Sequence, residues 1–272
     1  KMRLRIEDGL RSPDSRVLNE KHAMIRKVDK EQYFTDRNDS QRLIGLLNLD
    51  DYDRIIEPSA GDGAFSDYLP DCVAIDLDPK KDHIIKHDFL EWFPDMGHQK
   101  TLTIGNPPFG RNAKIARLFT RHASVFSDTI AFVLPAQCKR ETWINHFPEY
   151  FHLRHSEDFF CHVKCVFQIW DRKDTKRPKI ERRSSHSDFE IHHRHLSRTD
   201  DRPKADFVIG QVTGKVLDTD KVTKGSQYFI VDKTTDKRVR KRMENFDLED
   251  YKKKSIGAVS ISQSELIQLY DK

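Results

Sequence analysis

The chain has 272 residues, 34% of them charged and 36% hydrophobic, with a formal net charge of +4. This length fits one α/β domain of roughly 170 residues and a smaller appended module, and the small net charge excludes binding through a uniformly cationic surface. The sequence has no long apolar run and no secretory signal pattern, and its 4 cysteines lack framework spacing, so we expect an intracellular protein without membrane association.

The first clear chemical pattern runs over 55–65 and predicts a short apolar strand, a glycine-bearing loop and the start of a helix. Gly61 and Gly63 allow a tight turn and a close approach of the backbone to a ligand. The glycine spacing of dinucleotide-binding loops is absent, and Glu57 and Asp62 would repel a pyrophosphate. These acids favour a cationic ligand, such as S-adenosylmethionine with its sulfonium and α-ammonium groups.

Two acidic positions follow further along the chain. A predicted strand over 72–75 ends at Asp76, where a carboxylate can hold the two hydroxyl groups of a ribose. Asp88 then stands beside Phe89, a pair suited to the amino group and the ring of an adenine. The alternative for each acid is the common role of a helix cap or a turn former.

The tetrapeptide Asn106, Pro107, Pro108 and Phe109 follows an apolar run over 101–104, so we expect it at the sheet edge where α/β folds bind ligands. An aromatic amine such as adenine N6 is a poor nucleophile because its lone pair is delocalised into the ring. The Asn106 side-chain carbonyl and the Pro107 backbone carbonyl can each accept one N–H of such an amine as it attacks a sulfonium methyl. Two prolines stiffen the turn, and Phe109 offers a flat face for the target ring. The alternative is a rigid turn without chemistry.

The next segments predict structure more than function. A helix over 112–123 and buried strands over 129–135 and 164–170 complete an α/β core. Residues 172–203 are charged and histidine-rich with little apolar periodicity, which predicts a basic linker or insert. Strand-like runs over 205–216 and 227–232, and a terminal helix that begins at a Ser262 cap, predict a small substrate-recognition module.

Two further groups of polar residues have alternative interpretations. Lysine and arginine gather in three clusters, which predict either salt-dependent phosphate contacts or solvated surface: 172–183, 237–242 and 252–254. Cysteine and histidine gather at two places. The spacing of Cys161, His162 and Cys165 matches no standard zinc finger, and the denser group lies in the polar segment: His186, His192, His193 and His195. We expect the second group to lie in a solvated loop, and we predict no bound metal.

In this order, the motifs resemble those of the class I S-adenosylmethionine-dependent amino-methyltransferases, specifically the adenine-N6 group with an Asn-Pro-Pro-aromatic motif. The resemblance covers roughly residues 30 to 170 and rests on these segments: 32–35, 57–65, Asp76, 88–89 and 106–109. The motif order is similar to the γ-type order of DNA adenine methyltransferases and to compact members from phage and other viral genomes. It implies an α/β fold, with a Rossmann-like class I methyltransferase sheet and a smaller C-terminal α+β module.

The resemblance also implies a division of the chain and a set of site residues. The expected parts are an extension (1–30), the methyltransferase domain (31–171), the basic linker or insert (172–203) and the C-terminal module (204–272). Tyr33, Phe34 and Thr35 would border the methionine end of the cofactor, and Glu57, Ser59, Ala60, Gly61 and Asp62 would form its loop. Asp76 would hold the ribose, Asp88 and Phe89 the adenine, and Asn106 would lie between the cofactor and the target amine.

The implied activity is methyl transfer from S-adenosyl-L-methionine to adenine N6 of a base flipped against Asn106 to Phe109. The implied partner is nucleic acid, with DNA preferred over RNA. Proteins with this tetrapeptide also methylate adenine in RNA or a glutamine side chain in proteins, and an inactive nucleic-acid-binding scaffold is a further alternative. In such enzymes an aromatic of a late strand can face the flipped base, which makes Phe159, Phe160 and Phe167 candidates beside their alternative role in the core.

Overall fold

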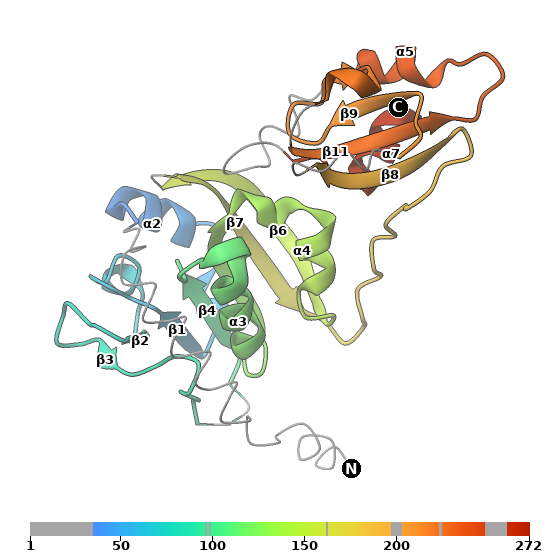
Figure 1. Cartoon of the computed structure of the whole chain (residues 1–272). Coiled ribbons are helices and arrows are strands. Elements are labelled where there is room, and N and C mark those ends of the chain that lie inside the picture. The colour runs from blue at the N-terminus through green and yellow to red at the C-terminus, as the bar shows by residue number, and fades with distance from the viewer. Residues whose placement is uncertain are drawn as a thin grey trace. The chain divides into compact units, whose positions relative to one another are not determined.

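The computed structural model describes residues 35–95, 97, 99–161, 163–196, 203–222, 225–247 and 260–272. The predicted extension, Tyr33, Phe34 and the basic cluster over 252–254 lie outside the described residues. The chain forms two compact units, the first spanning Lys1–Leu134 with Gln168–Asp171 and the second spanning Pro135–Phe167 with Arg172–Lys272. Figure 1 shows the elements of both.

Seven strands form the larger sheet, in the order β3-β2-β1-β4-β5-β7-β6 (Figure 1). Their bounds are β1 Arg54–Pro58, β2 Val73–Asp76, β3 Ile85–Lys86, β4 Thr101–Gly105, β5 Thr129–Pro135, β6 Phe151–Cys161 and β7 Val163–Arg172. β1 pairs in parallel with β2 on one side and β4 on the other, and β4 pairs in parallel with β5. The order of the strands therefore reverses between β1 and β4.

The central strands β4 and β5 form where the sequence is almost continuously apolar or β-branched. Every residue of β4 and β5 is buried, as expected of parallel strands that are covered on both faces. The first unit contains two α-helices, α2 Arg37–Ile44 and α3 Lys114–Ala123, among its described residues. It also contains three short 3-10 helices there: η2 Leu49–Asp51, η3 Ser66–Tyr68 and η4 Arg111–Ala113. The helix predicted over 112–123 is confirmed from Lys114 onward and buries Ile115, Ala116 and Phe119.

Gly110 shows why α3 starts where it does. This residue has a φ of 64°, and a Cβ atom there would lie 2.7 Å from Cγ1 of Ile115. Only glycine avoids both the backbone strain and this clash. The chain can therefore turn sharply from the Asn106 to Phe109 segment into the helix.

The second unit contains a four-stranded sheet in the order β10-β9-β11-β8. Besides β6 and the first part of β7, this unit contains η5 Ala136–Lys139, α4 Glu141–His146, β8 Phe189–Leu196, β9 Phe207–Gly210, β10 Val216–Leu217, η6 Thr219–Lys221, β11 Gly225–Asp232, α5 Val239–Glu244 and α7 Gln263–Asp271. One core joins sheet residues such as Phe207 and Ile230 to Val239 of α5 and Leu266 of α7. Ser262 and Glu265 form the capping box that starts α7, as the sequence predicted.

These two sheets confirm the predicted α/β fold class, a Rossmann-like class I sheet with a smaller C-terminal α+β module. No helix within the described ranges is long and apolar enough to span a bilayer.

The basic linker or insert expected over 172–203 is corrected in its later part. Its later part forms β8, which pairs along its length with β11. Phe189 is buried and Ile191 packs against the same core, but the histidines that follow hide this alternation in the sequence. His192 and His193 therefore belong to a strand and not to a solvated loop. No group of histidine, cysteine and acidic side chains suited to a metal occurs among the described residues.

The basic cluster over 172–183 is partly committed to internal contacts. The Arg177 guanidinium donates hydrogen bonds to the carbonyl oxygens of Phe147 at 3.2 Å and Pro148 at 3.4 Å, and also to those of Ile144 and Phe151. Burial lowers the pKa of Arg177 from its ordinary value. This arginine stabilises the chain that follows α4, so we do not assign it to a phosphate contact.

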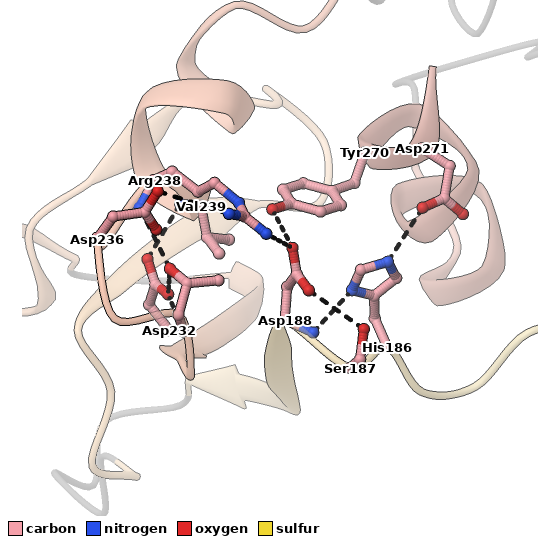
Figure 2. A network of polar contacts seen from close by, with 10 residues as sticks. His186, Ser187, Asp188, Asp232, Asp236, Arg238, Val239, Tyr270 and Asp271 are labelled. Atoms are coloured by element: carbon pink, nitrogen blue, oxygen red, sulfur yellow. Dashed lines mark hydrogen bonds and ion pairs between the residues drawn. The ribbon is translucent and has the colours of Figure 1, made fainter.

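The cluster over 237–242 is likewise engaged within the second unit. Arg238 donates a hydrogen bond of 3.0 Å to Asp188, which also accepts one of 2.9 Å from the Tyr270 hydroxyl (Figure 2). Arg240 forms ion pairs with Asp218 at 2.7 Å and Glu244 at 3.0 Å. These contacts join the start of β8 to α5 and α7, which gives the arginines a structural role.

Asp232 terminates β11 and starts the turn into α5 (Figure 2). Its side chain is 4% exposed, and its two carboxylate oxygens accept the backbone N–H of Thr234 at 2.8 Å and of Val239 at 3.0 Å. One bond closes the turn after β11, and the other satisfies the N–H of the first residue of α5.

We expect Asp232→Ala to lower the free energy of unfolding by about 1–2 kcal/mol, because both N–H groups lose their acceptor. Urea denaturation followed by circular dichroism measures the change. Asp236→Ala is the matched control, since Asp236 lies in the same turn with its side chain 57% exposed. Equal stability of the two variants would contradict the capping role.

Candidate functional site

The site lies at the carboxyl ends of β1, β2 and β4. Because these strands are parallel neighbours, the segments that follow them leave the sheet at the same edge. The segment after β1 is the glycine-bearing loop, and the segment after β4 begins at Asn106. The strand order reverses between them, which is the position where open α/β sheets bind ligands.

Three residues of the glycine loop have backbone torsions in the left-handed region. Ser59, Gly61 and Gly63 have φ values of 54°, 56° and 80°. The positive φ of Gly63 favours glycine, and a Cβ atom there would also lie 2.9 Å from the Asp67 carboxylate, which would have to shift. The Ala60 N–H donates to the Ile75 carbonyl at 2.9 Å, which fastens the loop to β2.

Asp76, at the end of β2, joins the loop to the turn after its own strand. Its carboxylate accepts the Gly61 N–H at 2.7 Å and the Asp78 N–H at 2.7 Å. A carboxylate has about four acceptor sites, so two such bonds leave capacity for the hydroxyl groups of a ligand. Asp76 is half-buried and lies at the end of β2, where the sequence predicts a contact with a ligand. It also holds the glycine loop, a role that the sequence did not indicate.

Glu57 is placed differently from the expectation of a loop acid that faces a cation. It lies within β1, its side chain is only 2% exposed, and it accepts the Ser66 N–H at 2.8 Å. Burial raises the pKa of Glu57 to about 8, although the hydrogen bonds from Ser66 and Phe65 oppose this rise. Glu57 therefore holds the turn at Ser66, which follows the glycine loop.

Asn106 is brought into contact with both other segments. Its Nδ2 donates to the Thr35 Oγ1 at 3.2 Å across 71 residues of sequence. The Ser59 hydroxyl, whose shorter bond goes to the Pro58 carbonyl at 2.5 Å, also lies 3.4 Å from the Asn106 backbone carbonyl oxygen. The side chain of Thr35 is 6% exposed. Three segments that the sequence singled out separately therefore meet at Asn106.

Phe109 and the late aromatic candidates are less accessible than the sequence suggested. The Phe109 side chain is 8% exposed, and its carbonyl accepts the Ile115 N–H at 3.1 Å at the start of α3. Phe159 and Phe167 are 6% and 0% exposed and belong to the core, whereas the side chain of Phe160 lies outside the described set. The predicted stacking surface of Phe109 is therefore covered in this structure.

Asp88 and Phe89 follow β3. The Asp88 carboxylate accepts the Leu90 N–H at 2.8 Å, which is the turn-forming role considered as its alternative. The Phe89 ring is 2% exposed and packs beside α3, with its centroid 5.1 Å from that of Phe119 and 5.0 Å from that of His122. The structure places this ring in the core. Phe89 therefore has no exposed face on which an adenine could stack.

Arg37 contacts the site but was missed by the sequence analysis. It lies in the first turn of α2 and donates to the carbonyl oxygens of Asp62 at 3.2 Å and Gly63 at 3.5 Å. It also forms ion pairs with Asp67 and, at 3.7 Å, with the Asp62 carboxylate. An arginine 2 residues after a predicted site residue and 25 residues before the loop gives no local pattern that would reveal this pairing.

Comparison with known proteins gives matches of structure alone. No family description and no curated protein matches the sequence. A Pyrococcus horikoshii protein provisionally described as an RNA methyltransferase is 18% identical, with 53% of this chain and 88% of that chain covered and a TM-score of 0.42. The N-methyltransferase NodS from Bradyrhizobium japonicum is 17% identical, with 51% and 96% covered and a TM-score of 0.38. The magnesium protoporphyrin IX methyltransferase from Synechocystis, with bound S-adenosylmethionine, is 10% identical, with 61% and 86% covered and a TM-score of 0.38.

The buried Glu57 predicts a pH dependence of stability. Between its ordinary pKa of 4.5 and its folded-state pKa of about 8, the folded protein retains a proton that the unfolded chain has released. The free energy of unfolding should therefore fall as pH rises through this window, by an amount on the order of a few kcal/mol.

We expect Glu57→Gln to remove this part of the slope and to gain stability relative to the wild type as pH rises toward 8. Urea denaturation at several pH values from 5 to about 8.5 measures it. Glu91→Gln, the same chemical change at an exposed position, is the matched control. Parallel pH profiles for the wild type and Glu57→Gln would contradict the assignment.

Proposed function

We propose that this chain is an S-adenosylmethionine-dependent methyltransferase that acts on adenine N6 in DNA. The observation that carries the proposal is the meeting of the Asn106 segment, the glycine loop and Thr35 at the strand-order reversal. A rigid turn without chemistry would explain the two prolines, but it would not explain why an asparagine amide is oriented beside a ligand-type loop.

The residues present fit the proposed cofactor. The glycine loop lies at the sheet edge, and Asp76 retains acceptor capacity next to Gly61. Asp62 adds a carboxylate to the loop, 3.7 Å from the Arg37 guanidinium. We assign Asp76 to the ribose hydroxyls and the loop from Ser59 to Asp62 to the methionine part. When bound, S-adenosylmethionine supplies an electrophilic methyl group on a positively charged sulfur.

The target amine is served by the Asn106 segment. The Asn106 Nδ2 donates to Thr35, and we assign the side-chain carbonyl oxygen, which has two acceptor sites, to one N–H of the target. The Pro107 backbone carbonyl is assigned to the second N–H. Together they favour electron density on the amine nitrogen as it becomes a nucleophile. They hold the planar amino group without having to deprotonate it first.

The preferred substrate is a base in DNA, flipped out of the duplex. Several basic side chains remain exposed in the second unit, which supports salt-dependent phosphate contacts: Lys173, Lys179 and Arg182. Since the Phe109 ring is covered, stacking on it would need a movement of the side chains around it. The amide and carbonyl acceptors do not depend on that movement.

The first experiment is transfer of labelled methyl from S-adenosylmethionine to duplex DNA, single-stranded DNA, structured RNA and protein extract, followed by analysis of the labelled product. N6-methyladenine in DNA is the expected result. Label in RNA or on glutamine would keep the chemistry and replace the substrate. An absence of label with retained nucleic-acid binding would overturn the proposal in favour of an inactive scaffold.

We expect Asn106→Ala to abolish turnover while cofactor affinity stays within about threefold of the wild type, because the amide serves the amine and not the cofactor. Methyl-transfer rates and calorimetric binding of S-adenosylmethionine measure the two effects. Asn38→Ala, at an exposed position on α2, is the control. Substantial activity of Asn106→Ala would overturn the mechanism.

Asp76→Ala should weaken cofactor binding by at least about tenfold, since it removes the proposed ribose acceptor and a bond to the loop. Asp78→Ala is the matched control, because the Asp78 side chain pairs with Lys80 on the surface. Unchanged affinity of Asp76→Ala, measured by calorimetry, would show that the ribose assignment is wrong.

A further inference from the structure

The segment from Thr35 to Arg37 contacts both halves of the proposed site. Thr35 accepts the Nδ2 hydrogen bond of Asn106 at 3.2 Å. Two residues later, Arg37 donates to the carbonyl oxygens of Asp62 and Gly63 in the glycine loop. The amine-binding segment and the cofactor loop are thus connected through a third, short piece of chain.

The Thr35 contact holds the Asn106 amide in place. An amide group has a donor end and an acceptor end, and only the acceptor end serves the N–H of a target amine. The Thr35 hydroxyl accepts the hydrogen bond of Nδ2 and so anchors this amide group at its donor end. Thr35 is buried, so water does not readily replace this bond.

The Arg37 contact differs from an ordinary surface ion pair. Its side chain is 40% exposed, and its ion pairs with Asp62 and Asp67 by themselves would contribute little to stability. Its planar guanidinium, however, also reaches two successive carbonyl oxygens of the loop, and Gly63 is in the left-handed region with a φ of 80°. Bonds to both carbonyl groups fix the orientation of these peptide units.

The distance between the two contacts is fixed by the start of α2. Asp36 lies between them as the N-cap, and its side chain accepts the Asn38 N–H at 2.8 Å. Its carbonyl accepts the Ser40 N–H at 2.9 Å. Capping and the first helical hydrogen bond hold the backbone from Thr35 to Arg37 in one conformation.

We infer that Thr35 and Arg37 are positioning residues on one short segment of the chain. Thr35 holds the Asn106 amide in place, and Arg37 holds the glycine loop. This inference rests on the proposed function. It changes the role of Thr35 from a residue that borders the cofactor to one that acts through Asn106. It also predicts that the two residues affect different steps, since one serves the amine and the other the cofactor.

The test of Thr35 compares Thr35→Val, which keeps the shape and removes the hydroxyl, with Thr35→Ser, which keeps the hydroxyl. We expect Thr35→Val to lower kcat by about 10- to 100-fold with S-adenosylmethionine Kd within about threefold, because misplacement of a positioned group chiefly slows the chemical step. Thr35→Ser should restore kcat to within about threefold of the wild type. Thermal unfolding of both variants checks that the fold is retained.

The test of Arg37 uses Arg37→Lys, which keeps the charge and loses the planar bridge to the carbonyl groups. We expect its Kd for S-adenosylmethionine to rise about tenfold, with kcat at saturating cofactor within about threefold. Arg42→Lys, in the last turn of the same helix, is the matched control and should leave both quantities unchanged.

Each outcome separates this inference from the proposed function. If the wild type transfers methyl groups but Thr35→Val keeps its kcat, or loses cofactor affinity instead, the role of Thr35 is overturned and the proposed function stands. Unchanged cofactor affinity of Arg37→Lys overturns the role of Arg37 in the same way. If the wild type neither binds S-adenosylmethionine nor methylates any of the substrates tested, the proposed function fails and this inference fails with it.

Discussion

The reversal of strand order between β1 and β4 is the constraint on which the rest of the site depends. Parallel neighbours must end at the same edge, so the loop after β1 and the segment after β4 emerge side by side. Three side-chain contacts then hold these segments together. The Asp76 carboxylate accepts an N–H of the loop, the Ser59 hydroxyl lies near the Asn106 carbonyl, and Thr35 accepts a hydrogen bond from the Asn106 side chain.

The buried Glu57 side chain, which holds the turn after the glycine loop, lowers the stability of the fold as pH rises above its ordinary pKa. Glu57 is an acid in the centre of a parallel sheet, where burial disfavours its charged form. An oxygen of its carboxyl group nevertheless accepts the Ser66 N–H at the turn that follows the loop. Replacing it by an apolar residue would leave that N–H without its acceptor. A buried acid is therefore consistent with a site whose geometry matters more than maximal stability.

The second unit shows that a cluster of basic residues in sequence is not by itself a nucleic-acid-binding surface. Arg177 binds carbonyl groups around the end of α4, Arg238 binds Asp188, and Arg240 lies between two acids (Figure 2 shows the contacts of Arg238). An arginine engaged in such contacts must break them before it can bind a phosphate. The exposed lysines and arginines around them are the better candidates for partner contacts.

The sequence alone determined the α/β class, most of the strands, the capping box of α7 and the motifs of the proposed site, because these depend on periodicity, on glycine and proline geometry and on local capping. Tertiary structure decided what depends on contacts between distant residues. It buried Glu57 and Phe89, covered Phe109, placed Arg37 on the glycine loop and turned part of the expected linker into β8. The physical reason is that burial, amide orientation and cross-strand pairing are set by partners far away in the chain, and no local pattern encodes those partners.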